Sequence, residues 1–323
     1  MLESVEFLSQ LKSSRAFSDK DLIKNDSEFS NIYAEIDNEV NLRINLLRKG
    51  GKKIYINDCL QKKQSEIKNF IRSVCFSSGD INIVRGEPSY RRMWLDKVVF
   101  QLEPVYFELT ARFNRLIKQR SHFWRSNIFK NNGSDSLLDS YDSQIATIGT
   151  RIYRRRRRAI EKMTPYVEYW HNHLSGSKEK INLNYLSKIE ISHYEDEKKI
   201  ISEYIEKLLD QRSLEEITGK CNVGPHRDDI EFFINNFSLR KFGSSGQQRT
   251  MILALKLAEI DLLRNTLFLN PIFILDDVLA ELDLDRQKIL LDSVGKKSQC
   301  FISATHLDSF NKEFVENSQL IYL

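Results

Sequence analysis

Cysteine, long apolar runs and an excess of one charge are all scarce in this sequence. None of the four cysteines belongs to a C-x-x-C pair; they are Cys59, Cys75, Cys221 and Cys300. This spacing excludes an obvious zinc site or disulfide framework and suits a reducing compartment. No apolar run approaches the roughly 18 residues that a membrane-spanning helix needs, and the opening Met1-Leu2-Glu3-Ser4 lacks the basic and apolar regions of a secretion signal. We therefore expect a cytoplasmic protein without a membrane partner.

Charge is nearly balanced, which limits the overall electrostatic field. Lys and Arg number 49 and Asp and Glu number 45, so the formal net charge is +4. A nucleic-acid ligand must therefore be argued from local clusters. The composition, 41% hydrophobic and 29% charged, is typical of a globular protein, and 323 residues suffice for one large or two ordinary domains.

The N-terminal stretch predicts a helix followed by a small antiparallel meander. Apolar residues recur at helical spacing at Leu2, Val5, Leu8 and Leu11. Strand-like segments follow at 31–36, 40–47 and 53–56, and residues 70–76 are a further candidate strand. Gly50 and Gly51 predict a hairpin turn, because glycine readily adopts positive φ.

The remaining chain changes pattern twice. Between residues 90 and 215, apolar residues recur three or four apart, which predicts helices packed as a bundle or short arm. After residue 225, helices predicted at 247–265 and 284–294 alternate with buried strands at 272–275 and 300–302, and residues 319–323 are a candidate third strand. We expect an α/β fold in which one nucleotide-type domain, made of residues 1–90 and 221–323, is interrupted by a helical insertion at 91–220.

Two carboxylates follow the apolar run Ile272–Leu275. Asp276 and Asp277 come directly after this predicted strand, at the strand end where α/β sheets bind ligands. Paired carboxylates there suit Mg²⁺, with Asp276 as the metal-side ligand and Asp277 polarising a water. The alternative is a helix N-cap, a position in which Asp is favoured.

Two further segments have the chemistry of a phosphate site. Small residues at 243–246 open the helix predicted at 247–265, and exposed amides at a helix start bind anions such as phosphate. An ordinary N-cap at Ser244 or Ser245 is the alternative. Thr305 and His306 follow the second buried strand, where a γ-phosphate sensor can sit, although a lone histidine is more often structural.

In their order and spacing these segments resemble an ATP-binding-cassette ATPase. Ser244-Ser245-Gly246-Gln247-Gln248 looks like the signature loop. Asp276 and Asp277 look like the Walker B pair, with Asp277 where most cassettes carry Glu. Glu281-Leu282-Asp283 looks like the D-loop, and His306 looks like the switch histidine. The fold implied is an α/β ATPase head, a mixed sheet with helices plus the antiparallel meander, interrupted by a helical insertion.

More narrowly, the chain resembles the RecF family. Three stretches carry this resemblance: Gly79–Pro88 with its continuation through Arg91-Arg92 to Asp96, the segment Gly224–Asp229, and Leu275–Leu290. Together they extend the resemblance over essentially the whole chain. Three such motifs in the same order make the resemblance to this family highly specific.

The resemblance implies a role in DNA replication, recombinational repair and the SOS response. RecF-type proteins are cytoplasmic DNA-binding ATPases that recognise single-stranded or gapped DNA and work with RecR and RecO to load the recombinase. ATP drives a head-to-head homodimer in which each nucleotide lies between one subunit's P-loop and the other's signature loop. By this resemblance Asp276 holds Mg²⁺ through water, Asp277 orients the attacking water and His306 senses the γ-phosphate. The residues implied to contact the ATP cofactor are Ser244, Gly246, Gln247, Glu281 and Asp283.

One departure from the family pattern concerns the phosphate-binding loop. The family motif Gly-x-x-x-x-Gly-Lys-Ser/Thr cradles phosphates with backbone amides and a lysine. Nothing in this sequence fits it, since Gly50-Gly51-Lys52-Lys53 lacks the first glycine and the hydroxyl residue. Met1–Val5 resembles the helix that follows that loop, so we expect about 35 to 45 residues of the family's opening segment to be missing. We expect weak or no ATP hydrolysis from these 323 residues, and whether the chain is an enzyme stays open.

Two basic clusters favour contacts with nucleic acid. Residues 107–130 hold six Lys or Arg, among them Arg112 and Arg115, against the single acid Glu108. A second cluster is a run of five on a predicted helix: Arg154, Arg155, Arg156, Arg157 and Arg158. At 100° per residue they surround the helix, so some must lie near its packing face while the rest can neutralise phosphates. The alternative is a solvated helix paired with acids such as Glu161; neither cluster offers a base-reading code, so we expect backbone or junction recognition.

Three alternatives stay open at this level. The chain can be a DNA-binding or partner-docking module without nucleotide turnover, in which case salt-sensitive DNA binding would ignore ATP. It can be a nucleotide-binding subunit of a transporter, since such subunits also have a signature loop and a Walker B motif. The arginine-rich helical insertion argues against this alternative. It can also be a non-functional gene remnant, which cooperative unfolding would argue against.

Overall fold

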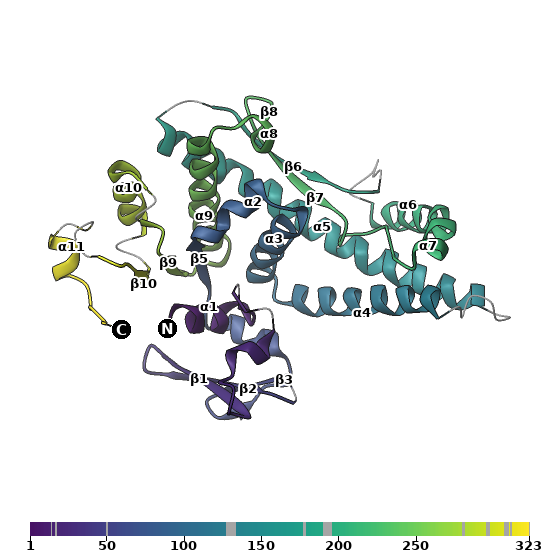
Figure 1. The fold of residues 1–323 in the computed structure, drawn as a ribbon, viewed down its shortest axis with the longest axis horizontal. Helices are drawn as coiled ribbons and strands as arrows, with labels where there is room; N and C mark the ends of the chain where they lie inside the picture. Colours follow the sequence, from purple (N-terminus) through teal and green to yellow (C-terminus); the bar gives the residue numbers. More distant parts are fainter. Residues whose placement is uncertain are drawn as a thin grey trace. The chain divides into compact units, whose positions relative to one another are not determined.

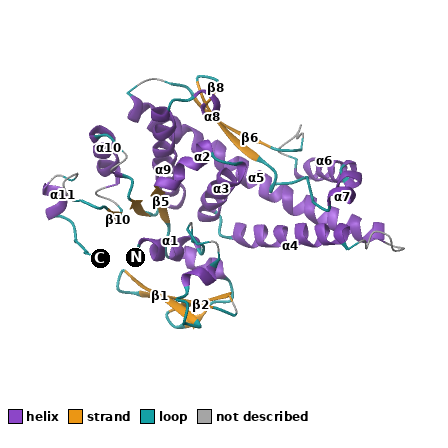
Figure 2. Ribbon diagram, in the orientation of Figure 1, coloured by secondary structure: helices purple, strands orange, loops and turns teal. Residues whose placement is uncertain are grey.

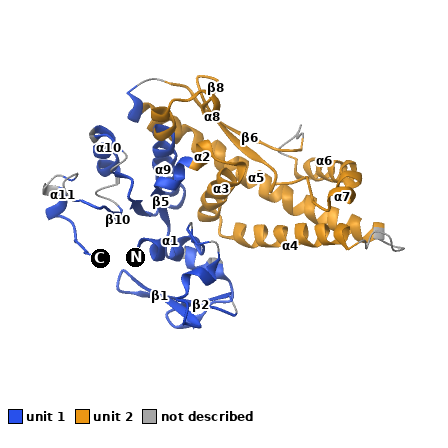
Figure 3. Ribbon diagram, viewed as in Figure 1, with its two compact units in different colours: residues 1–81, 173–176, 250–323 blue, residues 82–172, 177–249 orange. Residues whose placement is uncertain are grey.

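The computed structural model shows two compact units. It describes residues 1–322 except positions 14, 17, 50, 127–133, 177–178, 190–195, 280–281, 295–297, 307–309 and 311. Unit 1 comprises residues 1–81, 173–176 and 250–323, and unit 2 comprises residues 82–172 and 177–249 (Figure 3). Figure 1 labels the helices and strands, and Figure 2 colours them by type. The domain bounds expected from the sequence stay a prediction.

A four-stranded antiparallel meander lies in unit 1. Its strands pair in chain order: β1 (Phe29–Ile36), β2 (Val40–Leu47), β3 (Gly51–Ile56) and β4 (Cys59–Leu60). Alternate residues are buried on one face, and the four that are at most 1% exposed are Leu42, Ile44, Leu46 and Ile54. Leu47 pairs with Gly51 across the β2–β3 hairpin, so the predicted meander is confirmed.

The second sheet of unit 1 is parallel, with the order β10-β9-β5. Its strands are β5 (Ser73–Ser77), β9 (Ile272–Asp276) and β10 (Cys300–Ser303). The apolar centre of β9 is fully buried, as the continuous apolar run predicts. Because the strands are parallel, their carboxyl ends meet at one edge, where Asp276 pairs in register with both Ser77 and Ser303.

Helices of unit 1 agree with the sequence periodicity. α1 (Leu2–Gln10) contacts β5 and β9, and α9 (Ser245–Leu267) belongs to unit 1 from residue 250 onward. The other helical segments are η1 (Asp19–Leu22), η2 (Gln64–Asn69), η3 (Ser78–Asp80), α10 (Leu284–Val294) and α11 (Lys312–Glu316). The candidate strand at 319–323 is wrong, because residues 319–322 form no strand and their apolar side chains are exposed.

Helices make up most of unit 2. They are α2 (Ile81–Arg85), α3 (Pro88–Leu102), α4 (Val105–Arg125), α5 (Ser134–Ser175), α6 (Glu197–Asp210), α7 (Arg212–Thr218) and α8 (Leu239–Phe242). A buried ion pair joins α4 to α5, with Arg120 Nε 2.6 Å from Asp142 Oδ1. The chain's three tryptophans all belong to this unit: Trp94, Trp124 and Trp170.

A small antiparallel sheet in unit 2 was not expected. It consists of β6 (Ile181–Leu186), β7 (Asp229–Ile234) and β8 (Phe237–Ser238). β6 lies inside the stretch expected to be helical, although its buried Ile181 and Leu183 alternate with polar residues in the way a strand requires. Trp94 of α3 packs edge-on against Phe232 of β7, with ring centroids 5.9 Å apart. Among the helices that the structure describes, none is both long and apolar enough to cross a membrane.

Candidate functional site

The carboxyl edge of the parallel sheet in unit 1 brings a predicted carboxylate together with two serines. Ser303, at the end of β10, donates a hydrogen bond to Asp276 Oδ1 at 3.0 Å. The same Ser303 oxygen accepts the backbone N–H of Asp277 at 3.0 Å. Ser77 ends the strand on the other side of Asp276. With its side chain 16% exposed, Asp276 is an oriented and largely buried carboxylate.

Arg15 supplies the counter-charge at this edge, which the sequence interpretation missed. Arg15 Nη2 contacts Asp276 Oδ2 in an ion pair. Because the guanidinium is well exposed, water and salt screen the pair and its contribution to stability is small. The two residues lie 261 positions apart, so no local pattern indicates the contact.

Asp277 occupies a sharp turn directly after β9. Its φ is +57°, a left-handed conformation that Asp tolerates better than most residues other than glycine. The residue is exposed. Such backbone conformations cluster at functional sites. The N-cap alternative does not fit Asp276 or Asp277, because α10 begins only at Leu284.

Asp283 is the residue that caps α10. Its Oδ1 accepts the backbone N–H of Arg286 at 2.9 Å, and its Oδ2 lies 3.0 Å from Arg286 Nη1. The side-chain amide of Gln287 donates to the carbonyls of Leu279 and Leu282 at 2.7 Å and 3.0 Å, which ties these two residues to α10. Glu281, expected to contact the cofactor, lies outside the described residues.

His306 lies three residues beyond the end of β10 and is exposed. It thus follows the carboxyl end of a strand in the same sheet as Asp276. The sensor role predicted for it stays a prediction.

The signature-like segment forms a capped helix start in unit 2. Ser244 Oγ accepts the backbone N–H of Gln247 at 3.2 Å, and Gln247 Oε1 accepts the N–H of Ser244 at 3.0 Å. This reciprocal pair is a capping box, so Ser244 is the N-cap of α9, as the alternative interpretation predicted. The capping box leaves Ser245 and Gly246 exposed in the first turn of α9.

Arg85 and Gln248 brace this helix start, and the sequence interpretation did not single out Arg85. Arg85 Nη2 donates to Ser245 Oγ at 3.1 Å, and Arg85 Nε bonds to Gln248 Oε1. The Gln248 amide donates to the carbonyls of Leu239 and Gly243, each at 3.2 Å. Gln248 therefore acts as a buried brace. The available signal was the position of Arg85 inside the first RecF-like stretch.

The donor chemistry of the Asp276 edge suits Mg²⁺ held largely by water and phosphate. No group of three or more His, Cys, Asp or Glu that could bind a metal occurs among the residues the structure describes. Mg²⁺ in phosphate sites is commonly bound through one or two carboxylates, with waters and substrate oxygens completing its shell. Asp276 meets that requirement, and it would share its charge between the metal and Arg15.

Basic residues on α4 form an exposed face. Arg112, Arg115 and Lys118 are all exposed, and within the described part of the chain none of them pairs with a carboxylate. Arg112 Nη2 reaches only the side-chain amide oxygen of Gln144, at 3.4 Å. We call these three residues the α4 basic face.

The arginine run of α5 is largely paired with acids. Arg154 lies 2.6 Å from Glu197, Arg155 lies 2.8 Å from Glu103, and Arg157 lies 2.8 Å from Glu161. Arg158 lies 3.7 Å from Glu103 and is half exposed. These pairs agree with the solvated-helix alternative, and they would have to open before the arginines could contact phosphate.

Arg156 is buried, and the DNA contact predicted for it does not fit this burial. Its Nε and Nη2 donate to the two carboxylate oxygens of Asp96 at 2.8 Å and 2.9 Å, and its Nη1 donates to the carbonyl of Pro225 at 2.6 Å. The neighbouring Tyr106 hydroxyl donates to the same carboxylate. Burial raises the pKa of this hydroxyl, so it stays protonated. Arg156 is the arginine that faces the packing side of α5.

Two of the family-like stretches are tied to each other in unit 2. Arg91 donates to the two carboxylate oxygens of Asp229 at 2.6 Å and 3.0 Å. Arg92 donates to the carbonyl of Asp228 at 2.8 Å. In unit 1, Asp80 of the first stretch lies 3.0 Å from Lys256 of α9. Much of the resemblance is therefore carried by residues that hold the fold together.

Comparison with known proteins decides the family. A DNA replication and repair protein RecF of Synechococcus sp. (strain CC9605) is 42% identical over 323 residues, which cover 99% of this chain and 88% of the relative. The RecF of Parasynechococcus marenigrum (strain WH8102) is 43% identical over 324 residues with the same coverage. The chain belongs to the RecF family. The prediction made from the three RecF-like stretches is thus confirmed.

Solved RecF structures confirm the α/β fold class. The structure of the recombination mediator protein RecF-ATPrS in the RecFOR pathway has a TM-score of 0.87 and 29% identity, covering 96% of this chain and 84% of that chain. The structure of RecF-ATP in the same pathway has a TM-score of 0.85 and 27% identity, covering 95% and 83%. No family model matches the chain.

Proposed function

We propose that this chain binds single-stranded or gapped DNA in replication and recombinational repair. The support is membership of the RecF family over 99% of the chain. With RecR- and RecO-type mediators it would help load the recombinase in the cytoplasm. The proposed domain division is that of a nucleotide-type lobe, residues 1–90 and 221–323, with residues 91–220 as a helical arm.

The α4 basic face is the single observation that best supports DNA contact. The only acid on α4 is Glu108, so its exposed arginines and lysine add to one another. A cation that neutralises a phosphate releases a condensed counterion, which favours binding to any sequence. Arg154, Arg155, Arg157 and Arg158 are secondary contacts in this proposal, because each already has a carboxylate neighbour.

For the nucleotide we propose an ATP-dependent homodimer with weak turnover. Bound Mg²⁺·ATP would supply the phosphate electrophile and its charge neutralisation. Asp276 would hold the metal through water, Asp277 would orient the attacking water, and His306 would contact the γ-phosphate. Ser244, Gly246 and Gln247 would meet the nucleotide of the opposite subunit, with Glu281 and Asp283 beside it. Support comes from the hydrogen-bonded order of Asp276 and from the exposed first turn of α9.

The DNA proposal is tested by removing one charge from the α4 basic face. Arg115→Ala should weaken binding to a gapped duplex about equally for every sequence and should lower the salt dependence of the affinity by about one phosphate contact. Fluorescence anisotropy at several salt concentrations measures both quantities. Arg240→Ala, which changes another exposed arginine of unit 2, is the matched control. An unchanged salt slope in Arg115→Ala would remove α4 from the DNA surface.

A DNA-binding module without nucleotide turnover is the alternative candidate, and the RecF relatives give it no support. DNA affinity that is identical with and without ATP and Mg²⁺ would select this candidate. The transporter alternative has no support from the relatives, which are RecF proteins.

A further inference from the structure

The outward face of the unit 1 meander carries aromatic and cationic side chains in one row. Tyr33 of β1 lies opposite Arg43 of β2, and Arg43 lies opposite Tyr55 of β3. Tyr33 is 66% exposed, whereas Leu42, which points to the other face of the sheet, is 1% exposed. We call these three residues the Tyr33–Arg43–Tyr55 row.

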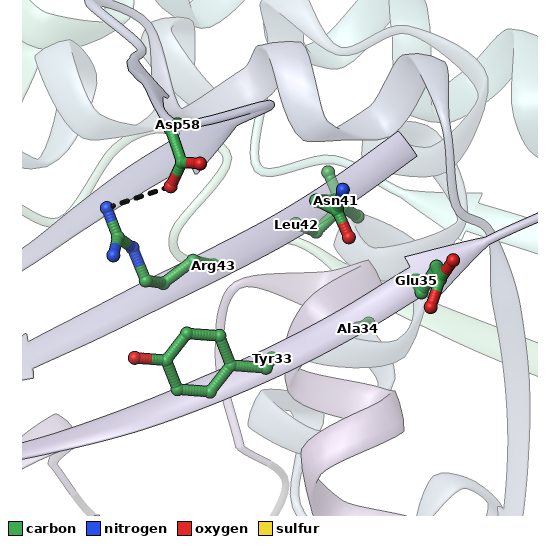
Figure 4. A pocket seen from close by; sticks show the side chains of 7 residues that line it. All are labelled: Tyr33, Ala34, Glu35, Asn41, Leu42, Arg43 and Asp58. Carbon is green, nitrogen blue, oxygen red and sulfur yellow. Dashed lines mark ion pairs between the residues drawn. The ribbon is translucent and has the colours of Figure 1, made fainter. Parts of the chain in front are cut away.

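Tyr33 and Arg43 of this row line a pocket of about 260 Å³ (Figure 4). The Arg43 guanidinium carbon lies 4.3 Å from the centroid of the Tyr55 ring, so the guanidinium rests on an aromatic face. Its outer nitrogen, Nη2, is only 3.4 Å from the exposed Asp58 carboxylate. Arg43 Nε is buried and has no hydrogen-bond partner in the described structure. Figure 4 shows the Tyr33 ring on the neighbouring strand, beside Arg43 at the pocket.

The two ends of this sheet differ in charge. The end with the β2–β3 hairpin carries Arg48, Lys49 and Lys53 together with one acid beside Arg48, Glu28. The opposite end, with the β1–β2 and β3–β4 turns, carries Asp37, Glu39 and Asp58. A polyanion that lies along the strands beside the row is therefore attracted to the hairpin end of the sheet and repelled from the opposite end.

We infer that the Tyr33–Arg43–Tyr55 row binds single-stranded DNA, an inference that rests on the DNA binding proposed above. An unpaired base stacks on Tyr33 and on the Arg43 plane, while its phosphates lie toward Lys53 and Lys49. Flat aromatic and guanidinium surfaces are the platforms on which unpaired bases stack. Bases inside a duplex are already stacked on one another, so this row distinguishes single-stranded from duplex DNA.

The adjoining row argues against an apolar protein partner on the same face. It consists of Asn31, Asn45 and Lys53 in register. The Asn45 side-chain oxygen is buried there without a hydrogen-bond partner in the described residues. Amide and ammonium groups suit phosphates and base edges, whereas an apolar peptide would leave them unsatisfied.

Removing one ring tests the inference with the chain as it exists. Tyr33→Ala should raise the Kd for a fluorescein-labelled single strand of mixed sequence about tenfold. This increase is within the range of binding free energy lost when one base no longer stacks on an aromatic ring. Tyr33→Phe keeps the ring and should bind like the wild type. The Kd for a duplex of the same sequence should change less than twofold in both variants. Tyr322→Ala removes another exposed tyrosine and serves as the matched control, and thermal melting checks that each variant is folded.

Each other outcome overturns the inference. If the wild-type protein binds single-stranded DNA and Tyr33→Ala binds it with the same Kd, the row is not the binding site. The proposed function is then unaffected. An equal loss for single strand and duplex refutes stacking. Loss of binding to added RecR with every DNA Kd unchanged makes the face a protein-docking surface. A wild-type chain that binds neither DNA removes the proposed function and this inference together.

Discussion

At the scale of single residues, Gly224 shows why a family-like motif needs a glycine. Its φ of +132° is open to glycine but strained for other residues. A Cβ added there would lie 2.2 Å from the hydroxyl oxygen of Tyr204, which is buried beside it. Both the backbone conformation and the packing therefore require glycine at this position.

Gly224→Ala should lower the free energy of unfolding by roughly 2–4 kcal/mol, because overpacking and backbone strain add. Gly79→Ala is the control, since a Cβ there meets only the Ser77 side-chain oxygen at 3.8 Å. Urea unfolding measures both variants. Equal stabilities would show that the loop around Gly224 relaxes freely.

His226 of the same motif is neutral in the folded chain. Its Nε2–H donates to the carbonyl of Cys221 at 3.0 Å, since a carbonyl can only accept. Burial, together with the nearby charges of Arg227 and Arg92, lowers the pKa of His226 to about 4. The unfolded chain therefore binds more protons than the folded chain between pH values of about 6.5 and 4.

Because the folded pKa is depressed, the contribution of neutral His226 is complete above the unfolded pKa and is lost as the pH falls toward 4. The difference in unfolding free energy between wild type and His226→Gln should therefore shrink by roughly 1–3 kcal/mol from pH 7 to pH 4. Denaturant titrations at several pH values measure it. His122→Gln, at an exposed histidine, is the control variant. A similar change in both variants would contradict the assignment.

At the scale of elements, α9 is the helix whose start depends on distant residues. The capping box of Ser244 and Gln247 is local, whereas the brace between Arg85 and Gln248 joins residues 163 positions apart. The exposed turn at Ser245 and Gly246 therefore owes its conformation to both.

Arg85→Ala should loosen the first turn of α9, because it removes two side-chain hydrogen bonds worth about 1 kcal/mol each. Hydrogen exchange of the amides at 245–250 should accelerate roughly tenfold or more. Arg115→Ala, at a residue with no hydrogen bond or ion pair in the described structure, should leave those amides unchanged. Wild-type protection in Arg85→Ala would show that the capping box alone holds the turn.

The difference between local and distant contacts also explains which features the sequence predicts. β9 and its carboxylates were predictable because a continuous apolar run and its polar end are adjacent in the chain. β6 was missed because six alternating residues between helical stripes are a weak signal. The partners of Asp276 and Arg156 were not predictable, because Arg15 and Asp96 lie 261 and 60 positions away. Helical symmetry predicted only that some arginine of the run would face inward.

At the scale of the whole molecule, the proposed site residues are divided between the two units. Asp276, Asp277 and His306 belong to unit 1, and Ser244 to Gln247 belong to unit 2. The row inferred to hold single-stranded DNA is in unit 1, whereas the α4 basic face is in unit 2. Variants in one unit can therefore be compared with variants in the other when DNA and nucleotide effects are separated.

The placement of the tryptophans has a practical result for such experiments. All three lie in unit 2, and Trp124 is in the last turn of α4. Intrinsic indole emission therefore reports on unit 2 alone and includes a probe on the helix proposed to meet DNA. Unit 1 contains tyrosines but no tryptophan. Tryptophan emission therefore does not report on events at the Asp276 edge, which need an added fluorescent label.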